Sequence, residues 1–295
     1  MRNKKAITVM VIIIAVLSFI ASAEGVFSGW GEAIEENQFL SLHGENIMLH
    51  GRGIYQNDSV SVAAQGIAQD AVTLILGIPM LLISLGLARK GSLKGRLMLT
   101  GTIGYFLYAY ISYTFLSMYN SLFLVYVMLM STCLFAFILC IMSFDMTALK
   151  NSFSPKLPVR FIGGFQLFIA FMLFMMWMGR IAPPLMAGGI PMGLEHYSTL
   201  VIQALDLGII VPAAILSGVL IIKKKHFGYL LSSIIIIKGM TMLTAITAMI
   251  IGMKNAGVAV STVEMTVFPL FNIVAIFCLI VLLRNINEKN YNGNQ

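Results

Sequence analysis

The chain has 295 residues, of which 59% are hydrophobic and 11% are charged, and its mean hydropathy is +0.91. A soluble domain carries about 25% charged residues, so the composition excludes a soluble globular protein. The length suits one bundle of membrane-spanning helices and is too short for such a bundle together with a separate soluble domain. The sequence therefore predicts an all-α fold, a polytopic transmembrane helical bundle.

Eight apolar stretches are long enough to cross a hydrocarbon core about 30 Å thick, which needs about 20 apolar residues per helix. In chain order they cover residues 6–23, 67–88, 97–117, 121–143, 161–181, 198–222, 228–253 and 265–283. They predict a bundle over residues 59–283, with an extracytoplasmic segment before it (24–58) and a cytoplasmic tail after it (284–295).

The first stretch, within residues 1–23, has two interpretations. Three basic residues precede an apolar run that ends in Ala21-Ser22-Ala23, a pattern that also describes a cleaved signal peptide. Retention as a signal-anchor gives eight helices, and cleavage gives seven. We favour retention because the run is long enough to anchor the chain.

Basic residues indicate the orientation of the bundle. With the N-terminus inside, 15 of the 19 lysines and arginines fall in cytoplasmic segments. Arg52, Arg180 and Lys254 fall outside, and Lys238 lies within a span. This asymmetry follows the positive-inside rule and predicts a cytoplasmic C-terminus. The net charge of +7 then favours contact with anionic membrane lipids over contact with nucleic acid.

Polar residues mark the outer end of the second stretch. Gln65 and Gln69 are four residues apart on one helix face, and Asp70 lies beside them. Asp58 or Ser59 is the predicted N-cap. This helix therefore begins outside the membrane and carries two amides and an acid into it.

Two groups of opposite charge lie deep within later stretches. Asp206, three residues after Gln203, lies in the sixth stretch, and Lys238 lies in the seventh. An ionised group at mid-bilayer costs roughly 2.5–3.5 kcal/mol, so both should face the bundle interior. Their predicted depths differ by about 10 Å, which leaves room for a water or a third polar group between them. Such a pair indicates a ligand or ion pathway, or an ion pair that locks two helices.

The third stretch adds tyrosines to the same predicted cavity. Tyr105 and Tyr108 are three residues apart and share a helix face, whereas Tyr113 and Tyr119 are predicted to be interfacial anchors. The sequence thus predicts a polar cavity that opens outward. Its wall is formed by Gln65, Gln69, Asp70, Tyr105, Tyr108, Gln203, Asp206 and Lys238.

Metal and cofactor sites are not expected. His43, His50 and Glu45 offer ligand atoms, but their spacing matches no metal-binding pattern, and a glycine-rich turn region explains them better. The three cysteines fall within spans and are predicted to be packing residues. The sequence contains no P-loop, zinc-protease or nucleophile-elbow motif, and no catalytic residue is predicted.

An internal repeat relates the second and third stretches to the sixth and seventh. Pro79 and Pro212 are each followed by serine five residues later and glycine sixteen residues later, and Tyr105 then corresponds to Lys238. Both copies run from outside to inside, which predicts parallel repeats about an axis along the membrane normal. Each proline is expected to kink its helix near mid-membrane.

Three stretches, 54–74, 204–212 and 228–239, resemble a family of uncharacterised bacterial multi-pass membrane proteins. The resemblance implies a bacterial inner membrane and carries no activity.

Three functions are compatible with the sequence. The leading one is a secondary permease or receptor for a small polar or anionic solute, with Lys238 holding the anionic group and Asp206 carrying a proton or modulating the lysine. The second is a non-catalytic scaffold or accessory subunit that binds a partner membrane protein through a fold with an architectural ion pair. The third is a membrane enzyme that uses Asp70 or Asp58 on a lipid or envelope precursor.

Overall fold

A computed structural model describes residues 3–32 and 37–288, and the remaining parts of the predicted N-terminal, extracytoplasmic and C-terminal segments lie outside the described residues. Within these ranges, seven helices are long and apolar enough to cross a membrane. They coincide with seven of the eight predicted stretches. The prediction of a multi-pass helical membrane bundle is therefore confirmed.

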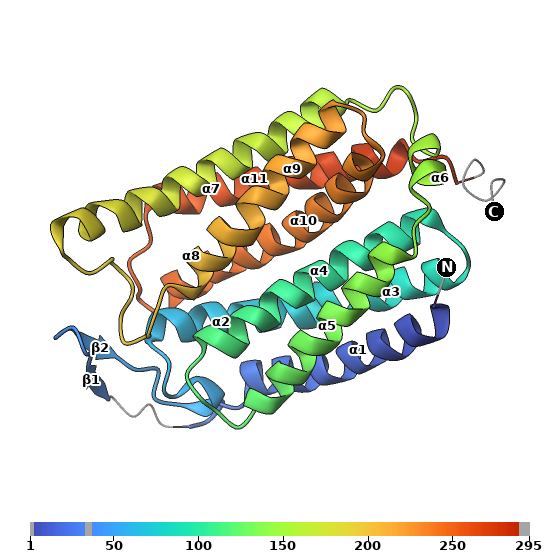
Figure 1. Cartoon of the computed structure of the whole chain (residues 1–295). Helices are drawn as coiled ribbons and strands as arrows, with labels where there is room; N and C mark the ends of the chain where they lie inside the picture. Colours follow the sequence, from blue (N-terminus) through green and yellow to red (C-terminus); the bar gives the residue numbers. More distant parts are fainter. Residues whose placement is uncertain (1–2, 33–36, 289–295) are drawn as a thin grey trace.

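The helices form two groups that are successive in sequence and adjacent in space (Figure 1). The first group is α1 (Lys4–Phe27), α2 (Val60–Val72), α3 (Ile78–Arg89), α4 (Leu93–Leu116) and α5 (Phe123–Met142). The second is α7 (Val159–Ala187), α8 (Val201–Leu205), α9 (Val211–Ile222), α10 (His226–Asn255) and α11 (Thr262–Arg284). The short helix α6 (Met146–Asn151) connects them.

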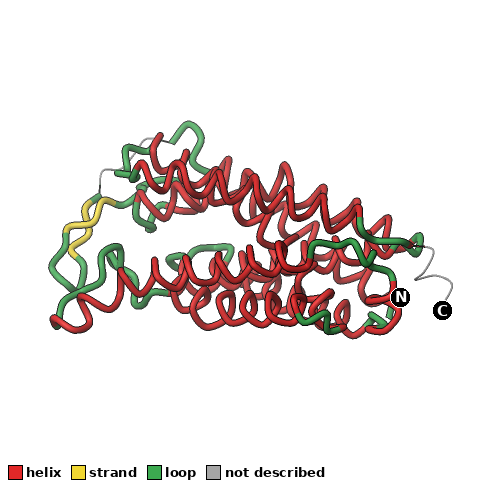
Figure 2. Tube along the Cα trace, turned by 90° about the horizontal axis from the view of Figure 1, so that it is seen from above, coloured by secondary structure: helices red, strands yellow, loops and turns green. Residues whose placement is uncertain are grey.

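The segments outside the long helices lie at the two opposite ends of the bundle. Both termini and α6 lie at one end, and the two strands and the α7–α8 connection lie at the other (Figures 1 and 2). The predicted cytoplasmic and extracytoplasmic segments are therefore at opposite ends of one long bundle.

A small hairpin departs from the all-α prediction. Strands β1 (Gln38–Leu40) and β2 (Asn46–Met48) pair antiparallel, and a 3-10 turn, η1 (Gly53–Tyr55), follows them. Gly44, with a φ of 82°, lies in the turn between the strands, a conformation that glycine adopts at little cost. The glycine-rich segment thus forms turns, as expected.

Helix α4 is the element around which both groups pack. Fifteen of its 24 residues are buried, and Tyr105, Phe106 and Tyr110 are among the largest fully buried side chains. It contacts α3 and α5 in its own group and α10 in the other. The tyrosines, threonines and glycines that make α4 less apolar than the other long helices face neighbouring helices, and small and polar residues are typical of helix–helix contacts within membranes.

Glycines allow α4 and α10 to approach closely. A Cβ added at Gly101 would lie 2.5 Å from the Cβ of Ile237, and one added at Gly104 would lie 3.9 Å from the Cγ2 of Ile234. Residue types without a side chain let helix backbones come together in a bilayer. The two groups therefore meet at the middle of α4 and α10.

The two prolines follow π-helical turns, which the sequence did not predict. The turn η2 (Thr73–Gly77) joins α2 to α3, and η3 (Asp206–Ile210) joins α8 to α9. Pro79 and Pro212 are the second residues of α3 and α9. A proline lacks the N–H for an ordinary helical bond, and the wider π turn adjusts the backbone just before it.

The α3–α4 and α9–α10 connections have the same geometry, with residue numbers that differ by 133. Helices α3 and α9 have 12 residues each, and η2 and η3 have five each. The Ser92 amide donates to the Leu87 carbonyl at 3.1 Å, and the Lys225 amide donates to the Leu220 carbonyl at 2.9 Å. The two connections are thus alike at the level of single hydrogen bonds.

Helix α1 passes through the predicted cleavage site without interruption. It contacts α2, α3 and α5, and Ala21 and Ser22, just before that site, are buried. The helix continues to Phe27, and the retention of the N-terminal stretch stays a prediction.

Glycine at position 228 is required by the close approach of α9 and α10. A Cβ there would lie 2.4–2.6 Å from backbone atoms of Leu220 and Ile221, which cannot rotate away. We expect Gly228→Ala to lower the free energy of unfolding by about 1–3 kcal/mol through overpacking, measured by equilibrium denaturation in detergent. Gly239→Ala, on the same helix with no atom within 4 Å, is the control and should be neutral or stabilising by about 1 kcal/mol. Equal destabilisation by both variants would contradict the packing argument.

Candidate functional site

The eight predicted residues do not form one wall, and four of them belong to two separate polar clusters. Asp206, Tyr108 and Lys238 belong to the first, which lies between the two helix groups. Asp70 belongs to the second, which lies within the first helix group.

The central charged cluster consists of Asp206, Tyr108, Trp177 and Lys238. The Tyr108 hydroxyl donates to Asp206 Oδ1 at 2.7 Å, and the Trp177 indole N–H donates to Asp206 Oδ2 at 2.9 Å. The Lys238 ammonium lies 3.9 Å from the centre of the Tyr108 ring, within the range of a cation–π contact. Asp206 and Lys238 are both only 8% exposed. Tyr108 therefore contacts both charges and is the intervening polar group that their depths suggested.

Four separate segments supply the cluster. Asp206 is the first residue of the π turn η3, Trp177 comes from α7, and Lys238 comes from α10. Tyr108 comes from α4, in the other helix group. The hydrogen bond between Tyr108 and Asp206 thus crosses between the groups.

The first helix group has a neutral pair at the corresponding positions. Thr73 opens η2 as Asp206 opens η3, and Tyr105 corresponds to Lys238 in the same numbering offset. The Thr73 and Tyr105 hydroxyls are 2.9 Å apart and hydrogen-bonded. At positions related by the offset of 133, the segment from η2 to α4 therefore carries an uncharged pair, whereas the segment from η3 to α10 carries an acid and a lysine.

The second cluster, here called the tyrosine cluster, surrounds Asp70. The Tyr55 hydroxyl donates to Asp70 Oδ2 at 2.5 Å, and the Tyr113 hydroxyl donates to Oδ1 at 3.1 Å. Tyr110 and Tyr126 complete the cluster, and the Tyr126 ring stacks on Tyr113 with centroids 5.4 Å apart. Tyr113 is 8% exposed, so its prediction as an interfacial anchor is wrong, because it turns inward to bind the acid.

Asp58 lies at the outer end of the tyrosine cluster. Its Oδ1 accepts hydrogen bonds from the Met118 amide and the Tyr197 hydroxyl, both at 3.0 Å. Ser59 caps α2 by accepting from the Val62 amide, which confirms one of the two predicted N-caps. Burial raises the pKa of Asp58 to about 6, although these two hydrogen bonds lower it.

The three glutamines of the predicted wall do not lie together in one site. Gln65 is half-buried and donates to the Ser61 carbonyl of its own helix at 3.2 Å. Gln69 is buried and its amide nitrogen has no partner among the described residues, and Gln203 is buried in α8. These residues do not join the charged side chains in one binding wall.

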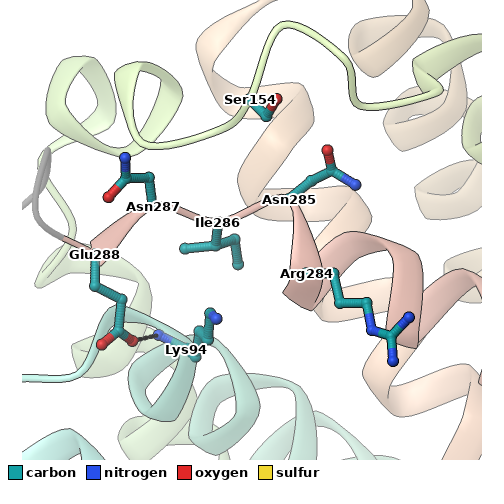
Figure 3. A pocket seen from close by; sticks show the side chains of 7 residues that line it. All are labelled: Lys94, Ser154, Arg284, Asn285, Ile286, Asn287 and Glu288. Atoms are coloured by element: carbon teal, nitrogen blue, oxygen red, sulfur yellow. Dashed lines mark hydrogen bonds between the residues drawn. The ribbon is translucent and has the colours of Figure 1, made fainter.

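Two hollows on the described part of the chain have linings that contain none of the eight residues. One, at the end that carries the termini, has a volume of about 520 Å³ (Figure 3). It is lined by Lys94, Ser154, Arg284, Asn285, Ile286, Asn287 and Glu288. The other is apolar, has a volume of about 270 Å³ and runs along η2 and α3. The clusters are instead enclosed by packed helices.

The three candidate metal ligands, His43, Glu45 and His50, do not form a metal-binding group in the described part of the chain. His43 and Glu45 are exposed in the hairpin turn, and no group of three or more His, Cys, Asp or Glu within residues 3–32 and 37–288 is arranged to hold a metal. Burial, together with Arg52, lowers the pKa of His50.

Sequence reasoning missed Tyr55, Tyr126 and Trp177. Trp177 lies in a methionine-rich run of α7. It is one of only two tryptophans in the chain, and an indole N–H within a span needs an acceptor. That requirement was a usable signal, whereas nothing local to Tyr55 or Tyr126 marks them.

No protein-family model, curated protein or solved structure matches this chain. The resemblance to uncharacterised bacterial membrane proteins therefore stays a prediction.

Asp58 should make stability depend on pH. Because its folded-state pKa is raised from 3.8 to about 6, its contribution is fully present below about pH 4 and is lost as the pH rises through 6. The loss should reach roughly 3 kcal/mol. We expect Asp58→Asn, which keeps both hydrogen bonds to Oδ1, to remove this part of the pH dependence of unfolding. Glu195 is also near Asp58, so the pH dependence of unfolding is compared between the wild type and Asp58→Asn. Identical pH profiles of the two proteins would contradict the raised pKa of Asp58.

Tyr108→Phe should show how much the hydrogen bond between Tyr108 and Asp206 contributes to the free energy of unfolding. The ring that Lys238 contacts is kept, whereas Asp206 loses one of two donors. A buried acceptor left without a partner costs about 1–3 kcal/mol, measurable by denaturation in detergent. Tyr119→Phe, at an 80% exposed tyrosine, is the control and should change stability by less than about 0.5 kcal/mol. The same small effect for both would contradict the hydrogen bond.

Proposed function

We propose that the chain forms eight transmembrane helices in two parallel four-helix repeats, with α4 as the eighth span. Support comes from the shared geometry of the α3–α4 and α9–α10 connections and from the contacts between α4 and α10. Gly101 meets Ile237 and Gly104 meets Ile234, and the offset of 133 makes each contact the counterpart of the other. Reciprocal contacts of this kind are expected of a two-fold arrangement.

The proposed orientation places both termini in the cytoplasm. The described basic residues at the start of α1, in the α3–α4 and α9–α10 connections and at the end of α11 lie at the end that carries the termini (Figure 1), which fits the positive-inside rule. Anionic lipid headgroups are the proposed partners of this end. A bacterial inner membrane is the proposed location, on the family resemblance.

The proposed activity is secondary transport, or reception, of a small polar or anionic solute at the central charged cluster. One observation carries it: Thr73 and Tyr105 fill the positions that Asp206 and Lys238 fill in the other repeat. The backbone therefore accommodates a neutral pair there. Ionisable groups at mid-bilayer cost several kcal/mol and mark substrate pathways, so charges that the fold does not require point to a function.

In this proposal the lysine binds and the repeats move. Lys238 holds the anionic group of the solute, and Asp206 balances its charge when the site is empty. Because Tyr108 is the member contributed by the first repeat, breaking its bond to Asp206 separates the repeats at the site. The π turn at Asp206 is a helix irregularity of the type found at functional sites, and sites at repeat interfaces are typical of secondary transporters.

The binding test uses Trp177 as an internal reporter. In a Trp30→Phe background, Trp177 is the only tryptophan. Trp30 is 76% exposed and is not part of the hydrophobic core, so this replacement should leave the fold intact. Organic anions and polar metabolites are screened for a change in its fluorescence, with Lys238→Met as the control. We expect a compound that changes emission in the first protein and not in the second.

The transport test exchanges the charged pair for the pair of the other repeat. We expect Asp206→Thr with Lys238→Tyr to fold with a melting temperature near that of the wild type and to lose uptake of the identified solute into proteoliposomes by at least tenfold. Wild-type uptake by this double variant would contradict the proposed site.

A scaffold is the second candidate, because both oxygens of Asp206 already have partners within the protein. It predicts that no compound changes Trp177 fluorescence and that Asp206→Asn and Lys238→Met each destabilise by about 3–5 kcal/mol. It also predicts that the double exchange keeps association with a partner membrane protein. A membrane enzyme has less support, because Asp70 is 2% exposed beneath the tyrosines.

A further inference from the structure

A second ionisable group within the spans has no cation to balance it. Asp70 is 2% exposed, and a Cβ added at Gly25 of α1 would lie 1.8 Å from its Oδ2. The backbone of α1 therefore lies directly on the carboxyl group. Such contact leaves no space for a hydrated metal ion, although a proton needs none.

The described groups around Asp70 are all neutral hydroxyls. They come from every element packed on it: Ser22 from α1, Tyr55 from η1, Tyr105, Tyr110 and Tyr113 from α4, and Tyr126 from α5. None of these is a lysine, arginine or histidine. A carboxylate in hydrocarbon without a cation is costly, whereas hydrogen bonds from Tyr55 and Tyr113 favour its ionised form. Burial without a cation favours the protonated form of Asp70, and the hydrogen bonds favour the ionised form, so the carboxyl group can both bind and release a proton.

Hydroxyls without a partner lie around Asp70, and one of them belongs to Tyr126, near the start of α5. Ser22, Tyr110 and Tyr126 are buried, and their hydroxyl oxygens have no hydrogen-bond partner among the described residues. Tyr126 lies within electrostatic range of both Asp70 and Asp58. Asp58 Oδ2 is likewise buried and unpartnered. Polar groups thus extend from the outer end of α2 to Asp70.

We propose that Asp70 is a proton-binding site that is loaded from the side of η1 through Tyr55. This rests on the proposed function, in which the bound proton would drive solute movement at the central charged cluster. Tyr55 passes its hydroxyl proton to the Asp70 carboxylate, to which it donates at 2.5 Å, as it accepts a proton from hydronium, which leaves as water. Tyr55 is then a neutral hydroxyl again, and Asp70 becomes a neutral acid. Release is the reverse of these steps.

The assignment separates the roles of the two buried acids. Asp206 has Lys238 as a nearby opposite charge, which favours its ionised form. Asp70 has no such partner among the groups that face it. The acid that exchanges protons is therefore the one in the first repeat, whereas the sequence had suggested Asp206.

Infrared difference spectroscopy between pH 5 and pH 8 tests the proposal on the full chain in lipid, without any solute. In an Asp58→Asn background, which removes the titration of that acid, we expect the carbonyl band of a protonated, buried acid at low pH, its loss at high pH, and its absence when Asp70→Asn is added. Asp206→Asn in the same background is the matched control and should keep a titrating band. The same band with and without Asp70→Asn, or a band that does not change with pH in the Asp58→Asn protein, would overturn the proposal.

Removing a hydroxyl donor provides a second readout that does not delete the acid. Tyr55→Phe and Tyr113→Phe should move the midpoint of the band to higher pH by about one to two pH units, because each donor favours the ionised carboxylate. Tyr119→Phe should leave the midpoint unchanged. An unchanged midpoint in both inner variants would place the titrating group elsewhere.

Transport assays separate this inference from the proposed function. If a solute is transported, Asp70→Asn should keep solute exchange and lose its response to a pH gradient, and a wild-type response would overturn the coupling role. If no solute is bound or transported by the wild type, the proposed function fails, whereas the infrared result still decides whether Asp70 exchanges a proton.

Discussion

The close contact between α4 and α10 is the constraint on which the rest of the structure depends. In a bilayer, helices gain little from hiding apolar surface, so they associate through packing and hydrogen bonds. Gly101 provides the packing, because a Cβ there would overlap the side chain of Ile237 in α10. Tyr108, further along α4, is then close enough to reach Asp206 and to lie beneath Lys238. Without this approach the two charges would lie in separate surroundings.

The two helix groups show how one backbone design serves two chemistries. Their π turns, prolines and tight connections correspond, but one presents hydroxyls and the other an acid and a lysine. The backbone irregularity before each proline orients the side chain at its start, whichever type it is. The two segments therefore differ in their side chains at these positions while their backbones correspond, and the tyrosine cluster has no described equivalent in the second group.

Spans and their ends could be predicted because they depend on local properties. Apolar length located seven of the long helices, and the preference of serine for caps located the start of α2. The hydrogen-bond partners of the buried acids could not be predicted, because they come from segments that are distant in the sequence and meet the acids only in the folded protein. Tyr113 stands near a helix end, where tyrosine is usually an anchor. It faces inward because η1 and α1 close over the same carboxyl, and no feature of its neighbours in sequence indicates that.

The position of Gly25 and Tyr55 before Asp70 in the chain has a consequence for biogenesis. Synthesis proceeds from the N-terminus, so α1 and η1 are available when the acid of α2 enters the membrane, whereas α4 and α5 follow later. Asp70 therefore meets a glycine surface and one hydroxyl at once and gains Tyr113 only when α4 arrives. Lys238 is in the opposite situation, since Tyr108, Trp177 and Asp206 all precede it and receive it as α10 inserts. The order of residues along the chain thus provides each costly group with a partner at the moment when it leaves water.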